Sequence, residues 1–269
     1  MVNAIDSLRQ LYLVMLWDIR KIARYRFFLL MRFSWFIIQV SIFAVLISSL
    51  VAARKGLTDF NYYQFYLFGV YTSILFSIAL FRGYEIAEEF EEGIIEYQLS
   101  LPIKRKILAI GRSIGGGIAS FIYTLPMFAF VVAMLGAFNL KAILISLLGT
   151  LLFSIGVVGL AASIVLFAKS GDITDILFGI IDALLLRLST IFYPAVVLSI
   201  FQPYYYAAIA NPLSHITDLI RIFFFFEDFK AIAISDPLSM IAYIVGFSIG
   251  LSSLTIFLIE KKVEGGGWK

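Results

Sequence analysis

Residues 76–111 read FSIALFRGYEIAEEFEEGIIEYQLSLPIKRKILAIG, and this stretch decides how the chain is organised. It holds the end of one apolar run, a charged segment of about eighteen residues from Glu89 to Lys106, and the start of a second apolar run. Glutamates dominate its first part, and the basic cluster Lys104-Arg105-Lys106 closes it. A loop that only joined two membrane helices would need fewer residues. The segment is therefore predicted to bind something outside the membrane.

The composition indicates a membrane protein. Of the 269 residues, 61% are hydrophobic and 14% are charged, against roughly 45–50% and about 25% in soluble domains. Several continuous apolar runs reach the ~20 residues that cross a bilayer as a helix, which favours an all-α polytopic protein over a barrel of alternating strands. The chain has no cysteine, so disulfides, thiolate metal sites and catalytic thiols are excluded.

Six transmembrane helices are predicted within a single domain, residues 1–269. They lie at about residues 28–51, 62–82, 107–135, 142–168, 176–201 and 238–259. Residues 1–26 lack the pattern of a cleavable signal peptide. Leu8, Tyr12 and Met15 recur at helical spacing beside polar residues, which predicts an amphipathic helix in the plane of the membrane interface. The alternative is an ordinary leader to the first span.

Lysine and arginine in the connecting segments indicate the orientation. With the N-terminus inside, thirteen basic residues fall on inner segments and five on outer ones. Both termini and the charged segment at residues 83–106 are therefore expected to be cytoplasmic. The net charge of +3 is modest and does not imply nucleic-acid binding.

The connection at residues 202–236 is long, mostly apolar and expected to be external. Asn211-Pro212 is typical of a helix start, with Asn as N-cap and Pro at the first helical position. The helix that follows carries Asp218 and Arg221 and is too polar to span, so a re-entrant or interfacial segment is predicted. Pro194 is expected to bend or unwind the fifth span, and Gly115-Gly116-Gly117 to allow either close helix packing or flexibility.

Two segments resemble the membrane subunit of type-2 ATP-binding-cassette exporters. Residues 92–105, EGIIEYQLSLPIKR, are similar to the family's Glu-x-Gly-Thr-Leu-Glu, then Leu-Ser-x-Pro, then basic pattern, with Ile94-Ile95 in place of Thr-Leu. Residues 210–221, ANPLSHITDLIR, look like its Asn-Pro-Leu-Thr segment that ends in arginine. The Ser-Gly often seen after the fifth span's proline is absent, since Ala195-Val196 follow Pro194.

The resemblance implies a dimer of permeases, each docked on a separate cytosolic ATPase that holds the ATP and Mg. Docking would use the N-terminal helix and a coupling helix over Glu85–Ser100, and the external helices would cap the path between the permeases. An apolar ridge with glutamates around it suits a partner groove, and the alternative is a solvated acidic loop. The residues assigned to docking are Ile86, Glu89, Phe90, Glu92, Gly93, Ile94, Glu96, Tyr97 and Pro102.

Charges inside the predicted spans are candidate path residues. Asp182 and Arg187 lie in the fifth span with Pro194, and intramembrane charges are costly unless paired or facing water. They either line the translocation path or form structural ion pairs. Arg32 and Arg112 are nearer the span ends, so a structural role or contact with lipid headgroups is expected for both in preference to transport. His215, the only histidine, has too few partners for a metal site.

The function predicted is outward transport of a hydrophobic or amphipathic substrate (drug, lipid, peptide or glycan) by the membrane subunit of an ABC exporter in the plasma membrane. No catalytic constellation or cofactor site is found in this chain, so it is not expected to be an enzyme. Its expected partners are the ATPase, a second or related permease, and lipid. The alternative is a secondary transporter or channel driven by an ion gradient, for which Asp182 is the main support.

Overall fold

The computed structural model describes residues 4–21, 26–53 and 60–262, and no strand occurs among them. Within these described ranges, five helices are long and apolar enough to cross a membrane. The first is composite, with α2 (Arg26–Ile38), the π-helical turn η2 (Gln39–Phe43) and α3 (Ala44–Ala53) in sequence. The others are α4 (Tyr62–Glu91), α6 (Arg105–Leu135), α7 (Leu140–Ala168) and α13 (Pro237–Lys262). The chain is therefore a helical, membrane-embedded protein.

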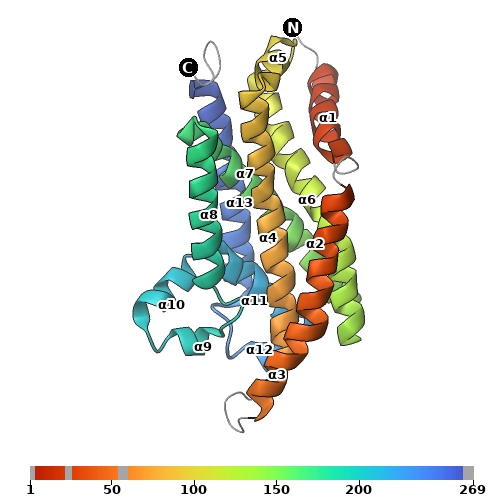
Figure 1. The fold of residues 1–269 in the computed structure, drawn as a ribbon, viewed down its shortest axis with the longest axis vertical. Helices are drawn as coiled ribbons and strands as arrows, with labels where there is room; N and C mark the ends of the chain where they lie inside the picture. Colours follow the sequence, from red (N-terminus) through yellow and green to blue (C-terminus); the bar gives the residue numbers. More distant parts are fainter. Residues whose placement is uncertain (1–3, 22–25, 54–59, 263–269) are drawn as a thin grey trace.

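The long helices form an elongated bundle (Figure 1). The short helix α5 (Ile94–Ser100) lies at one end, where α1 (Ala4–Lys21) begins and α13 finishes. The helices α9 (Ala195–Leu198), α10 (Gln202–Ile209) and α12 (Phe226–Phe229) lie at the other end. These are called the α5 end and the α10 end below. At ~1.5 Å per residue, α4, α6 and α7 each exceed the ~30 Å hydrocarbon core, so they extend beyond it.

The fifth predicted span, residues 176–201, is not one continuous helix. The helix α8 (Gly171–Arg187) has 17 residues and ends before Leu188, and an irregular segment leads to α9 and α10. The break was expected at Pro194, but the helix stops several residues earlier, and Pro194 is the N-cap of α9. A sixth continuous span is therefore not confirmed, and α8 with its irregular extension stands in its place.

Small residues bring the core helices together, as the triple glycine predicted. A Cβ on Gly117 would lie 2.7 Å from the Cα of Ile155 on α7, and one on Gly115 would lie 2.8 Å from the Cα of Met15 on α1. Both distances are shorter than van der Waals contact. Helix α6 therefore packs backbone to backbone against α7 on one side and α1 on another, and the predicted role of this run in close packing is confirmed.

The N-terminal helix is present, but its position differs from the prediction. Figure 1 shows α1 beside α6 with its axis close to the long axis of the bundle. Val14 meets Gly111, Met15 meets Gly115, and Gln10 donates a hydrogen bond to the Pro102 carbonyl. The helix thus packs lengthwise on α6 and does not lie across the bundle in the interface plane. The reason is that Leu11, Val14 and Met15 of its inner face pack onto Gly111 and Gly115 of α6, with Asp18 beside them.

Candidate functional site

A buried group of charged side chains joins α1, α4 and α6 near the α5 end. Arg112 of α6 donates from Nη1 to Asp18 Oδ1 of α1 at 2.6 Å and from Nη2 to Glu89 of α4. Lys21 of α1 donates to the other oxygen of Glu89. Arg112, Asp18 and Glu89 are each about 5% exposed. One guanidinium therefore ties three helices together, and we call this the Arg112 network.

A second ion pair continues this network along α4. Arg82 donates to both oxygens of Glu85 at 2.7 and 2.8 Å, and both side chains are buried. Burial raises the pKa of Asp18 to about 6, against the opposing effect of Arg112 and Lys21. Desolvation penalises the charged carboxylate, while each nearby cation stabilises it. Removing one partner of such a buried pair typically costs about 3–5 kcal/mol.

The predicted coupling helix over Glu85–Ser100 is interrupted. Helix α4 ends at Glu91, and Gly93 takes a φ of 73°, a conformation that glycine adopts without strain. Helix α5 then begins at Ile94 and runs for seven residues. The acidic segment therefore consists of the end of α4 and the short helix α5, joined by a turn at Gly93, and is not one rigid helix.

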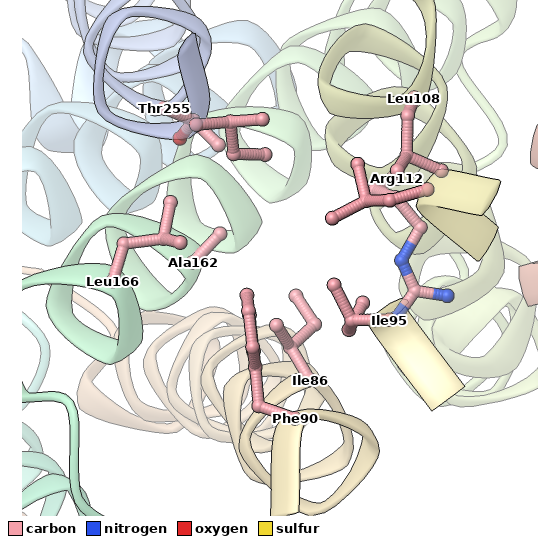
Figure 2. Close-up of a pocket in the computed structure, with 10 residues that line it drawn as sticks. Ile86, Phe90, Ile95, Leu108, Arg112, Ala162, Leu166 and Thr255 are labelled. Carbon is pink, nitrogen blue, oxygen red and sulfur yellow. The ribbon is translucent and has the colours of Figure 1, made fainter. Parts of the chain in front are cut away.

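The expected apolar ridge is not a continuous exposed surface. Ile86 is 7% exposed, and Figure 2 shows it with Phe90 and Ile95 facing a cavity of about 30 Å³. The cavity is also lined by Leu99 of α5 and by residues of three other helices: Leu108, Arg112, Ala162, Leu166, Thr255 and Ile259. Ile86 and Phe90 pack inside the fold because the turn at Gly93 directs α5 back over them.

The part of the predicted docking surface that remains exposed belongs mainly to α5 and the turn before it. Tyr97 is 66% exposed, and Glu92, Glu96 and Pro102 are exposed as well. Ile94 and Gly93 are half-buried. Glu89 is committed to the Arg112 network. The exposed part of the predicted docking surface therefore has Tyr97 as its one aromatic side chain, with the carboxylates of Glu92 and Glu96 beside it.

A polar stripe runs along the face of α4 that the bundle leaves partly uncovered. Ser73, Ser77, Phe81 and Tyr84 recur at helical spacing and are half-buried, while the residues between them are mostly buried. Ser77 donates to Asp182 Oδ1 of α8 at 2.9 Å. In Figure 1, α4 runs between α8 on one side and α2 on the other. Asp182 of α8 therefore lies beside this stripe of α4.

The two charges predicted for the fifth span have different settings. Asp182 is half-buried and accepts a hydrogen bond from Ser77. Arg187 is exposed at the last residue of α8. The structure does not bring these two residues together as an ion pair. The polar positions of α4 were missed by sequence reasoning, although the spacing of Tyr66, Ser73 and Ser77 within an apolar run was the signal for them.

At the α10 end, Asn211 and Arg221 hold the irregular segment after α8. Asn211 caps α11 (Pro212–Phe224), and its Nδ2 donates to the carbonyls of Leu185 and Leu188 at 2.7 and 2.8 Å. The last carbonyls of a helix lack internal partners. A single asparagine side chain therefore serves the end of α8 and the start of α11.

Arg221 is 1% exposed and has five hydrogen-bonding contacts. It donates to the carbonyls of Thr190, Ile191 and Phe65 and to Asp218 Oδ1, at 2.7–3.2 Å. Its guanidinium also stacks 3.4 Å from the centre of the Phe65 ring. Asp218 Oδ2 accepts from the Ile234 amide at 3.0 Å. Non-helical backbone at membrane depth requires such partners, so these residues explain how the chain breaks there.

In comparisons with known proteins, no protein-family model and no curated protein matches this sequence.

Proposed function

We propose that this chain is the transmembrane subunit of an ATP-driven type-2 ABC exporter and moves a hydrophobic or amphipathic substrate outward. The observation that carries the proposal is the Arg112 network. It joins α1, α4 and α6 beneath an exposed acidic and aromatic tip, so a force applied at the tip reaches two long helices at once. A loop held only by its ends would not transmit force in this way.

The excess of lysine and arginine on the predicted inner segments supports placing the α5 end in the cytosol and both termini inside. The α10 end would then face outward in the plasma membrane, with Asn211, Pro212, Asp218 and Arg221 holding its re-entrant helices. The ATP and Mg would belong to a separate soluble subunit. A second copy or a related permease would cover the uncovered face of α4.

The docking surface is redefined because Ile86 is buried and Phe90 is half-buried beneath α5. Tyr97 becomes the central anchor, with Glu92 and Glu96 beside it. Gln10 contacts Pro102, so the first half of α1, with Leu8 and Tyr12 each more than 60% exposed, extends the same surface. A few aromatic anchors usually carry most of an interface. Such apolar area beyond the membrane favours a protein partner.

The substrate path is proposed along the polar stripe of α4. Ser73, Ser77 and Asp182 present hydroxyl and carboxylate groups at membrane depth, where polar groups need water or a partner. Two facing copies would enclose this stripe between them. Pro194 and the irregular segment would lie at its outer end.

The test is recovery of the ATPase. The tagged chain is extracted from its native membranes in mild detergent, and ATP hydrolysis in the eluate is measured per mole of permease. Wild type and Tyr204→Ala, an exposed tyrosine of the α10 end, should retain ATPase, while Tyr97→Ala should lose tenfold or more. ATPase absent from the wild-type eluate, or retained in full by Tyr97→Ala, would contradict the proposal.

A second candidate is an ion-gradient-driven secondary transporter, which the Ser77–Asp182 contact favours. A carboxyl at membrane depth suits proton or cation coupling. Uptake into vesicles that depends on a pH gradient, needs no ATP and disappears in Asp182→Asn would select this candidate. Transport by Asp182→Asn that still requires ATP would select the exporter.

A further inference from the structure

The outward face of the second half of α1 is apolar, aromatic and basic. Leu13 and Trp17 are 53% and 51% exposed, and Arg20 is exposed on the same face. With Leu16 and Lys21 they line a shallow hollow of about 520 Å³. The opposite face of the helix, with Val14 and Asp18, is buried against α6. The exposed face therefore has no cover within the described residues.

The depth of this face follows from the Arg112 network. Arg112 lies about 23 residues from the other end of α6, a rise of about 35 Å, and Glu89 lies about 27 residues from the start of α4, or about 40 Å. The hydrocarbon core is ~30 Å thick and the bilayer with its headgroups ~40–45 Å. With the far ends of both helices at the edge of the hydrocarbon core, the network lies about 5 Å past the opposite edge by the α6 value and about 10 Å past it by the α4 value, that is, in the headgroup layer or at its outer edge. Asp18 and Lys21 belong to the network, so Trp17 and Arg20 lie at the same level.

Within the described part of the chain, this face has two cationic side chains, Lys21 and Arg20, and only Arg20 is available to bind a ligand. Lys21 is committed to Glu89, whereas Arg20 has no ion-pair partner among residues 4–21, 26–53 and 60–262. A guanidinium matches a phosphate group with two parallel hydrogen bonds. Tryptophan prefers the boundary between headgroups and acyl chains. The side chains of Leu13 and Leu16 supply apolar contact next to it.

We propose that this face of α1 binds the headgroup of an anionic phospholipid in the leaflet at the α5 end. Arg20 contacts the phosphate, Trp17 lies at the glycerol level, and Leu13 and Leu16 contact the first part of an acyl chain. A bound lipid would fill the hollow and hold α1 against α6 from outside. The proposal rests on the membrane location alone and not on the exporter function.

The test uses Trp17 as its own probe. Trp17, Trp35 and Trp268 are the tryptophans of the chain, so Trp35→Phe, Trp268→Phe leaves Trp17 alone in the full-length protein. This variant is reconstituted in vesicles of phosphatidylglycerol and phosphatidylcholine at equal mole fractions, with bromine on the acyl chains of one lipid or the other. Brominated phosphatidylglycerol should quench Trp17 about two- to fivefold more strongly than brominated phosphatidylcholine, since each cation near the surface favours anionic lipid.

Two controls make the result specific. Arg20→Gln should bring the two quenching values together, while Arg105→Gln, an exposed arginine on α6, should keep the preference. A variant that retains only Trp35, an exposed side chain of the first span, should show quenching without headgroup preference. Equal quenching of Trp17 by both lipids, quenching by neither, or a preference that survives Arg20→Gln would overturn the proposal.

Discussion

Replacing Arg112 by glutamine should destabilise the protein strongly near neutral pH. Arg112 is the hydrogen-bonding partner of Asp18 Oδ1, and Asp18 Oδ2 is buried without a partner in the described part of the chain. The variant therefore leaves a buried carboxylate unpaired, whereas Glu89 keeps Lys21. Loss of one partner from a buried pair costs about 3–5 kcal/mol. At roughly 2–4 °C per kcal/mol for a chain of about this size, Tm should fall by roughly 6–20 °C.

The measurement is thermal unfolding in one detergent, followed by tryptophan fluorescence, at about pH 7.5 and about pH 5. At the lower pH Asp18 binds a proton, because burial raises its pKa to about 6. The cost then falls to that of an unsatisfied neutral group, about 1–3 kcal/mol. The deficit of Arg112→Gln should therefore shrink on acidification.

Two further variants separate the ion pair from general disruption. Arg105→Gln, at the exposed start of α6, should leave Tm nearly unchanged. Asp18→Asn combined with Arg112→Gln should recover part of the loss, since no unpaired carboxylate remains. An Arg112→Gln protein whose Tm matches wild type at both pH values would refute the assignment of Arg112 as the link between the three helices.

Three other predictions concern single contacts. Burial raises the pKa of Asp18 from 3.8 to about 6, so the folded state binds the proton more tightly than the unfolded state and Asp18 contributes less stability as pH rises through this window. The Tm of wild type minus that of Asp18→Asn should therefore decrease from pH 4 to about 6.5. A difference that does not change with pH would contradict the burial of Asp18. Gly117→Ala should cost about 1–3 kcal/mol through contact with the Ile155 backbone, whereas Gly179→Ala, with nothing within 4 Å of the added Cβ, should be neutral or stabilising in the same unfolding assay. Arg221→Lys should lower Tm by roughly 4–12 °C, since one ammonium group cannot donate hydrogen bonds to three carbonyls and Asp218 together. An unchanged Tm in Arg221→Lys would show that those carbonyls find other partners.

The long apolar helices were predictable because hydrophobic runs of bilayer length have few alternatives. The spans at α4, α6, α7 and α13 follow from length and composition alone. The triple glycine of α6 indicated that other helices could pack closely against it. The direction of α1 was not predictable in the same way. Its amphipathic pattern only requires that one face be covered, and either a membrane surface or the glycine face of α6 satisfies that requirement.

The predicted docking ridge shows a second limit of predicting a surface from the helical spacing of apolar residues. Ile86, Phe90, Ile94 and Tyr97 fall on one face only if the helix continues through residue 93. Gly93 ends it with a positive φ, and the first two side chains then pack beneath α5. Glycine within a charged helical run signals such a turn, yet its consequence depends on which neighbours α5 meets. Leu108 of α6 and Ala162 of α7 line the same cavity as Ile86 and Phe90, and the place of α7 there cannot be inferred from residues 85–100.

The role of residues 211–221 in ending α8 becomes visible only in the folded structure. The apolar run from residue 176 to 201 favours one long helix, and nothing within that run accounts for its end at Arg187. The partners are remote: Asn211 takes the carbonyls of Leu185 and Leu188, and Arg221 takes those of Thr190 and Ile191. Gly69 of α4 completes the arrangement, because a Cβ there would lie 2.2 Å from the Ile191 carbonyl oxygen. The buried arginine of α11 is thus a sign that irregular backbone elsewhere in the chain needs hydrogen-bond donors, and that reasoning locates a broken helix where hydropathy predicts a continuous one.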